Sequence, residues 1–155
     1  MKCVIVTGGS RGIGSAICQK LAADTEYHIL INYHSNKEAA EQTLEAVKKN
    51  GATGEIIQFN VSDFEEVKNA LTHWQEANPE AIVEAIVNNA GITKDGLFMW
   101  MSPEDWSSVV NTSLNGFFNV TPFVKLYETA RGVSWGKQFQ QVFIAPTAQQ
   151  QRNTP

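Results

Sequence analysis

Closely spaced glycines follow an apolar run at the start of the chain. Residues 4–6 are Val-Ile-Val, and residues 7–14 read Thr-Gly-Gly-Ser-Arg-Gly-Ile-Gly, with the spacing Thr-Gly-x-x-x-Gly-x-Gly. Glycines allow backbone N–H groups to approach a diphosphate closely, and a helix N-terminus adds partial positive charge. The stretch therefore predicts a buried strand, a phosphate-binding turn and the start of a helix.

A second motif follows another apolar run. Residues 88–91 read Asn-Asn-Ala-Gly directly after Ala-Ile-Val at 85–87. A glycine-rich turn alone is a weak indication of a nucleotide site. Ligands of open parallel sheets bind outside the carboxyl ends of the strands, at the point where the strand order reverses. Two such turns, each after an apolar run, therefore predict one shared crevice.

Strand and helix patterns alternate along the chain, which is typical of a doubly wound parallel sheet. We predict strands near residues 4–6, 28–33, 55–60, 84–88 and 141–145. We predict helices over 12–23, from Ser35 to before Gly51, from Ser62 to Pro79, and from Ser102 to Pro122. The predicted fold class is α/β, a Rossmann-type sheet in a single, C-terminally incomplete domain.

Helix starts and apolar stripes refine these elements. Ser35 with Glu38, and Ser62 with Glu65, have the spacing of capping boxes. Residues three and four apart share a helix face. The predicted apolar faces are Ile13, Ile17 and Leu21 in the first helix, Ala40, Leu44 and Val47 in the second, and Phe64, Val67, Leu71 and Trp74 in the third. The long helix carries Trp106, Val109, Val110, Leu114, Phe117 and Phe118, and we expect exposed apolar surface around Trp106, Phe117 and Phe118.

Composition sets broad limits. The chain has 155 residues, 43% apolar and 18% charged, with a formal net charge of −4. This favours one globular domain, expected over residues 1–145, followed by a disordered tail over 146–155 that is rich in Gln, Thr and Pro. The charge argues against a nucleic-acid surface. No apolar run reaches the length of a membrane span, and no signal-peptide pattern is visible, so we expect a cytoplasmic protein.

Cysteines and histidines do not predict a metal site. Cys3 and Cys18 fall within apolar elements and are interpreted as buried thiols. The histidines are His28, His34 and His73, which lack metal-ligand spacing and are interpreted as surface or strand-end residues.

The two strand-end motifs together resemble the short-chain dehydrogenase/reductase family. The block Asn-Asn-Ala-Gly-Ile-Thr-Lys-Asp-Gly-Leu-Phe-Met at 88–99, with Asp-Trp at 105–106, is most similar to its bacterial 3-oxoacyl-acyl-carrier-protein reductases. The resemblance extends over about residues 1–121. It implies NADPH-dependent reduction of a 3-oxoacyl thioester of acyl-carrier protein to the 3-hydroxyacyl form, in fatty acid biosynthesis. It also implies a homo-oligomer formed through the long helix 103–121.

The same resemblance and the strand-end geometry assign cofactor contacts. Asn60 and Val61 would flank the adenine, and Asn88, Ala90 and Gly91 would line the ribose and nicotinamide. The full predicted set is Gly8, Ser10, Arg11, Gly12, Ile13, Gly14, Asn32, Tyr33, Asn60, Val61, Asn88, Ala90 and Gly91.

The end of the second strand favours NADP(H) over NAD. An acidic residue there would accept the ribose 2′-hydroxyl of NAD and repel a 2′-phosphate. Residues 32–36 read Asn-Tyr-His-Ser-Asn and contain no carboxylate. The guanidinium of Arg11 could pair with the 2′-phosphate; the alternative is a solvated loop charge.

The family's catalytic set is harder to find. Family members use a tyrosine as proton donor, a lysine four residues later that lowers its pKa, a serine that holds the substrate oxygen, and a helix asparagine that supports a proton relay. Ser113 stands at the asparagine position. The remaining candidates each fail on position or partner: Tyr33 with Lys37 lies at the wrong strand, Tyr127 with Arg131 comes too early, and Tyr27 and Ser134 lack partners.

Three functional interpretations remain open from the sequence. The first is the acyl-carrier-protein reductase. The second is a truncated, catalytically inactive NADP-binding fragment that lacks the Tyr-x-x-x-Lys pair. The third is a reductase of another small carbonyl substrate.

Overall fold

The sheet is parallel throughout, with the strand order β3-β2-β1-β4-β5. The computed structural model describes residues 1–123 and 142–143. The strands are β1 (Lys2–Val6), β2 (His28–Tyr33), β3 (Gly54–Gln58), β4 (Ile82–Asn88) and β5 (Val142–Phe143). The order reverses between β1 and β4, which confirms the predicted α/β, doubly wound class.

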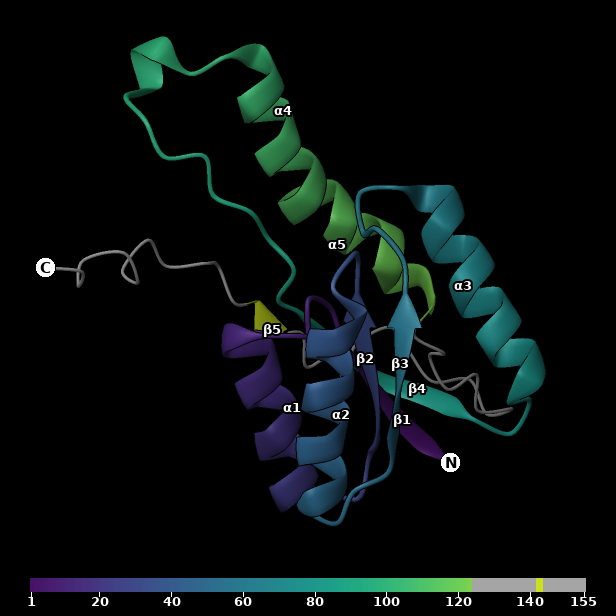
Figure 1. Ribbon diagram of the computed structural model, residues 1–155. Helices are drawn as coiled ribbons and strands as arrows, with labels where there is room; N and C mark the ends of the chain where they lie inside the picture. The colour runs from purple at the N-terminus through teal and green to yellow at the C-terminus, as the bar shows by residue number, and fades with distance from the viewer. Residues whose placement is uncertain (124–141, 144–155) are drawn as a thin grey trace, which may run out of the picture.

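Alternating side chains of β1 divide the core into two layers. Val4 and Val6 face α1 (Gly12–Asp24) and α2 (Lys37–Lys49), where they join a cluster that includes Cys18 and Val47. Cys3 and Ile5 face the opposite cluster, which includes Val67, Leu71 and Trp74 of α3 (Phe64–Ala77) and Val120. Figure 1 shows α1 and α2 on one side of the sheet and α3 on the other. Burial on both faces explains why residues 3–6 of β1 are all apolar.

The long helix begins and ends where the sequence predicts. The Ser102 side chain accepts a hydrogen bond of 3.0 Å from the Asp105 N–H, and Pro103 occupies the first turn. Helical backbone continues through α4 (Pro103–Val110), the π-helical segment η2 (Asn111–Asn115) and α5 (Gly116–Val120), and ends in the 3₁₀ turn η3 (Thr121–Phe123). In Figure 1, α4 projects away from the sheet. A short 3₁₀ helix η1 (Phe98–Trp100) precedes it, and the sequence analysis missed this element.

Both predicted capping boxes are wrong by one residue. The cap of α2 is Asn36, whose side chain accepts from the Ala39 N–H at 3.0 Å. The cap of α3 is Asp63, which accepts from the Glu66 N–H at 3.0 Å. Each site offers a serine followed by another capping residue, and the amide or carboxylate oxygen of the second makes the bond. Ser62 instead donates its hydroxyl proton to Asn60 Oδ1 at 2.8 Å.

The predicted stripe of α1 is confirmed only in part, since Ile17 and Leu21 are half-buried and pack against the core. Ile13 is 41% exposed, and the buried face consists of Gly14, Cys18 and Ala22. Small side chains let α1 lie close to the strands, so the large apolar residues of this helix sit at its edges.

The other stripes are confirmed in part. In α2, Thr43 is buried with Ala40 and Val47, whereas Leu44 is half-buried. In α3, Val67, Leu71 and Trp74 are buried, whereas Phe64 is 45% exposed. On the long helix Trp106 and Phe118 are exposed as expected, and Leu114 is exposed too, whereas Phe117, Val109 and Val110 are half-buried.

The C-terminal predictions are tested only at two residues. Val142 and Phe143 pair in parallel with Val87 and Asn88, so part of the predicted fifth strand is confirmed. The tail 146–155, the end of the expected domain at residue 145, and Tyr127, Arg131 and Ser134 lie outside the described residues. Among the residues that are described, no helix combines the length and apolar character needed to cross a membrane.

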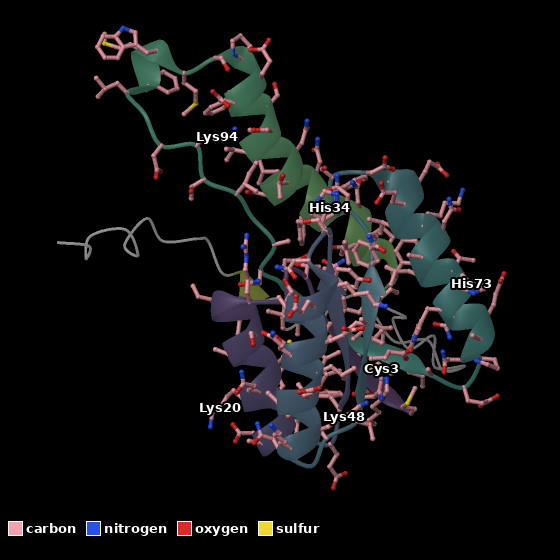
Figure 2. All side chains as sticks on the ribbon, in the orientation of Figure 1. Cys3, Lys20, His34, Lys48, His73 and Lys94 are labelled. Carbon is pink, nitrogen blue, oxygen red and sulfur yellow. The ribbon has the colours of Figure 1, made fainter. Side chains whose placement is uncertain are left out.

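The histidines are separated in space. His28 is paired within the sheet, with Nδ1 2.9 Å from Thr53 Oγ1 and Nε2 3.1 Å from Glu55 Oε1. Figure 2 shows His34 beyond the end of β2 and His73 on α3. The described part of the chain holds no group of three His, Cys, Asp or Glu side chains placed to bind a metal.

Both cysteines are fully buried, as predicted. Burial raises the pKa of the Cys18 thiol to about 12. The thiolate is the reactive form, so at pH 8 only about one Cys18 in ten thousand would be ionised in the folded state.

We therefore predict that iodoacetamide modifies Cys18 at the rate of unfolding. Mass spectrometry of peptides after a timed pulse at pH 8 would measure this, with urea-unfolded protein as the control for full reactivity. The folded state holds the proton more tightly, so the free energy of unfolding should fall as pH rises above about 9. Fast labelling of Cys18 without denaturant would contradict the burial.

Candidate functional site

The hydroxyl group of Thr7 joins the ends of β1 and β4. Thr7 is buried, and its Oγ1 accepts hydrogen bonds of 3.0 Å from the backbone N–H groups of Asn89 and Ala90. The same hydroxyl donates to the Val87 carbonyl at 3.2 Å, which also accepts from the Thr7 N–H at 3.0 Å. The first glycine-rich motif and the Asn-Asn-Ala-Gly motif therefore meet in one place.

The side chain of Asn89 fixes the turn from the other side. Its Nδ2 donates to the carbonyl oxygens of Thr7 at 2.8 Å and Gly8 at 3.2 Å. A Cβ atom at Gly14 would collide with the Gly8 carbonyl and lie 2.6 Å from Asn89 Nδ2. Close contact between the turn and α1 explains why position 14 holds glycine.

The end of β2 also positions this turn. Asn32 is buried, and its Oδ1 accepts from the Gly8 N–H at 3.1 Å while its Nδ2 donates to the Phe59 carbonyl at 3.0 Å. Tyr33 is buried next to it. Both were predicted to contact cofactor, but the structure uses the Asn32 side chain to connect the turn with the end of β3. Direct contact of either side chain with a cofactor stays a prediction.

The turn is open at Gly12. Gly12 has a φ of +56°, and no atom lies within 4 Å of the position its Cβ would take. The 13-residue helix α1 begins there without an acidic residue in its first turn, and its cap residue Arg11 is exposed. Asn88 Nδ2 is buried and has no hydrogen-bond partner among the described residues. Free N–H groups, a helix N-terminus and a guanidinium suit an anionic phosphate, and the unpaired amide can donate to a further polar group.

The segment 60–61, which follows β3, contacts the long helix. The Val61 carbonyl accepts from Asn119 Nδ2 at 2.9 Å, and a Cβ at Gly116 would lie 2.9 Å from Val61 Cγ2. Asn60 Oδ1 accepts from the Ser62 N–H at 3.1 Å. The segment after β3 is thus held against α5.

Ser113 lies within the π-helical segment η2 and is half-buried. Segments of π-helix inside α-helices occur frequently at functional sites. The neighbouring asparagines pair with each other, since Asn115 Nδ2 donates to Asn111 Oδ1 at 2.8 Å. The role of Ser113 in a proton relay stays a prediction.

The described tyrosines do not supply a proton donor at the crevice. Tyr27 precedes β2 at the opposite end of the sheet, where its hydroxyl donates to Glu84 Oε2 at 3.1 Å. Burial, followed by this hydrogen bond to Glu84, raises the pKa of Tyr27. Tyr33 is buried, and Lys37 is exposed and pairs with Glu41 at 3.5 Å. No Tyr-x-x-x-Lys pair therefore faces the crevice within the described part.

A surface ion pair holds the segment between β4 and α4. Lys94 Nζ lies 3.1 Å from Asp105 Oδ1, and Figure 2 shows Lys94 beside α4. The hydrogen bond from Lys94, then that from Ser102, holds the pKa of Asp105 below its usual range. Residues 91–100 are exposed throughout.

Sequence reasoning missed Thr7 and Asn89 as site residues, although both stand within the quoted motifs. A threonine at the end of a strand and a doubled asparagine were the available signals. Their significance depends on an 82-residue separation in sequence that only the fold brings to contact distance.

Comparison with known proteins gives consistent results. The family model described as short chain dehydrogenase matches residues 2–132, extending the resemblance past the predicted limit near residue 121. A 3-oxoacyl-acyl-carrier-protein reductase of Staphylococcus aureus is 41% identical over 118 residues, covering 76% of this chain and 47% of the relative. An acetoacetyl-CoA reductase of Cupriavidus necator is 38% identical over 132 residues, covering 85% and 52%.

Solved structures agree on the fold. A putative gluconate dehydrogenase of Agrobacterium tumefaciens is 30% identical with a TM-score of 0.72, covering 79% of this chain and 47% of that one. A Serratia marcescens short-chain dehydrogenase/reductase variant has a TM-score of 0.70 at 24% identity, covering 79% and 49%.

We predict that Thr7→Val destabilises the protein strongly. Valine keeps the shape of threonine but leaves the part-buried N–H groups of Asn89 and Ala90 without their acceptor, which costs roughly 2–6 kcal/mol at about 1–3 kcal/mol per group. Thr7→Ser, which keeps the hydroxyl, is the matched control and should lose less. Urea unfolding measures both; equal stability of the valine and serine variants would contradict the role of the hydroxyl.

Proposed function

The chain belongs to the short-chain dehydrogenase family, and from this premise we propose that its crevice binds NADP(H) for an oxidoreductase reaction. The observation that carries the proposal is the contact between the two strand-end motifs through Thr7 and Asn89. It brings the turn before α1, with its open position at Gly12, and the segment that holds the unpaired amide of Asn88 to the adjacent carboxyl ends of β1 and β4.

The proposed reaction is reduction of a 3-oxoacyl thioester of acyl-carrier protein to the 3-hydroxyacyl thioester. Similarity to the Staphylococcus aureus reductase and to the acetoacetyl-CoA reductase supports it. The chain spans about half the length of the curated relatives that it matches. The thioester substrate, and reduction itself, are therefore proposals about a site of which this chain provides the nucleotide-binding part.

The described residues have distinct proposed roles. When bound, NADPH would supply the hydride. The turn around Gly8, Ser10, Gly12, Ile13 and Gly14 would hold the diphosphate with backbone N–H groups and the dipole of α1. Asn88, Ala90 and Gly91 would orient the ribose and nicotinamide, and Asn60 with Val61 would flank the adenine. Ser113 would hold a water molecule for proton transfer.

The preference for NADP(H) over NAD(H) rests on charge. Arg11 is exposed at the start of α1, and residues 32–36 place no carboxylate at the end of β2. A guanidinium binds a phosphate with charge-assisted hydrogen bonds, so a 2′-phosphate would be attracted there.

The described tyrosines favour a second candidate, in which the chain binds the nucleotide but does not reduce a carbonyl. Tyr27 lies at the wrong end of the sheet, and Tyr33 is buried while Lys37 pairs with Glu41. A phenol needs a nearby cation to act as an acid at neutral pH. A reductase of another small carbonyl substrate is the third candidate, since no described residue defines the acyl group.

Oligomer formation is also proposed. The helix from Pro103 to Val120 exposes Trp106, Leu114 and Phe118. Exposed apolar side chains of this size are typical of protein interfaces, and we propose a homo-oligomer through residues 103–121. We also propose a cytoplasmic location.

We predict that Arg11→Ala weakens NADPH binding and leaves NADH binding nearly unchanged. Loss of hydrogen bonds to a charged group costs roughly 1.5–3 kcal/mol, or about a 10- to 150-fold rise in Kd. Titration calorimetry with both nucleotides measures the difference. Lys20→Ala is the matched control, because Lys20 lies near the other end of α1 and pairs with Asp24 at 2.8 Å. Equal loss for both nucleotides would contradict recognition of the 2′-phosphate by Arg11.

NADPH oxidation by the 155-residue chain in the presence of an acetoacetyl thioester distinguishes the first two candidates, since the first predicts turnover and the second predicts binding alone. Absorbance of the reduced nicotinamide measures turnover, and Ser113→Ala should slow it. Ser107→Ala is the matched control, since Ser107 is an exposed serine on the same helix. Calorimetric binding of NADPH without oxidation would instead support the second candidate, a binding protein without an acid.

A further inference from the structure

A buried threonine on α2 contacts the glycine-rich turn. Thr43 is buried, with its Oγ1 3.0 Å from the carbonyl oxygen of Ser10 and 2.8 Å from Ser15 Oγ. Gln19 Nε2 in turn donates to Ser15 Oγ at 3.2 Å. Neither the motifs nor the similarity to known proteins assigns a role to Thr43.

Proton accounting fixes the direction of this network. A carbonyl can only accept, and a threonine hydroxyl has one proton. Thr43 therefore gives its proton to the Ser10 carbonyl and accepts the proton of the Ser15 hydroxyl. Donation runs from Gln19 through Ser15 and Thr43 to the backbone of Ser10.

This direction determines where the next N–H points. The described residues contain no cis peptide bond, and in a trans peptide the carbonyl and the following N–H point in opposite directions. With the Ser10 carbonyl held toward α2, the N–H of Arg11 points away from α2. The side chain of Arg11 begins at the same residue, so the hydroxyl of Thr43 restricts both groups.

The turn needs such an anchor. Gly8 and Gly9 are fixed by hydrogen bonds of 3.1 Å and 2.8 Å to Asn32, and Gly14 by close packing. Between them, Ser10 is held by the contact from Thr43, and Gly12 has open space around it. Glycine-rich backbone loses more entropy than other backbone when it is ordered, so an anchor at Ser10 reduces the cost of ordering on binding.

We propose that Thr43 is a positioning residue that raises the affinity of the glycine-rich turn for NADPH by holding the Ser10–Arg11 peptide. The proposal rests on the proposed nucleotide binding. Its effect is on the binding constant, whereas a role confined to packing α2 on α1 would change stability alone.

The test compares three variants by titration calorimetry with NADPH and by urea unfolding. Thr43→Val removes the hydroxyl, and we expect Kd to rise about tenfold, the equivalent of one hydrogen bond of about 1.4 kcal/mol. Thr43→Ser restores the hydroxyl and should restore Kd to within about twofold. Asn50→Ala is the matched control: it removes another bond between α2 and α1, from Asn50 Nδ2 to the Gln19 carbonyl at 3.4 Å, far from the turn. It should lower stability without changing Kd.

Ser15→Ala supplies a second route to the same answer. It removes the donor to Thr43, and if the two hydroxyls act through one network, its effect on Kd should not add to that of Thr43→Val. A Thr43→Val protein with unchanged Kd, or equal shifts for Thr43→Val and Asn50→Ala, would overturn the proposal. The wild-type chain is measured first. If it fails to bind NADPH, the proposed function is overturned, whereas the proposal about Thr43 is tested only by the later comparison of the variants.

Discussion

The buried hydroxyl of Thr7 is the contact on which the rest of the site depends. Two backbone N–H groups of the Asn-Asn-Ala-Gly turn donate to this oxygen. The side-chain amide of Asn89 donates in turn to the carbonyl oxygens of Thr7 and Gly8. Gly14 must then be glycine, because α1 lies against the same carbonyl. The ends of the two apolar strands shield backbone N–H and carbonyl groups from water. These groups must find hydrogen-bond partners within the protein, and this requirement shapes the turn.

Much of the fold could be predicted because its signals are local. Residues 29–31 are an apolar run buried on both faces, and β2 forms over the predicted residues 28–33. The helix ends at Gly51 and Pro79 were also predictable from backbone chemistry. The caps were less so: serine and the next Asx residue both have capping side chains, and the choice between Ser62 and Asp63 depends on the bond that Ser62 makes to Asn60. Ile13 was misplaced because helical spacing alone does not say which stripe meets the strands.

The site was predictable as a set of strand ends, but not as a set of contacts. Gly8, Gly12 and Gly14 were identified by spacing, whereas the use of the Asn32 side chain as a clamp between Gly8 and Phe59 needs three strands in register. Thr43 gave no signal, because a threonine in the middle of a helix has no sequence pattern that marks it as an anchor for another segment. Tyr127 lies outside the described residues, so its exclusion as proton donor rests on sequence position.

The connection between Thr7 and Asn89 also has a consequence for the order of folding. β1 pairs with β2 within the first 33 residues, but its other edge pairs with β4, which comes much later in the sequence. The bonded groups of Thr7 and Asn89 are 82 residues apart. Closing a loop of that size costs conformational entropy before any stabilising contact forms. During synthesis, the glycine-rich turn would therefore remain unlocked until the chain beyond residue 90 has left the ribosome, and the crevice should be among the last parts of the sheet to become rigid.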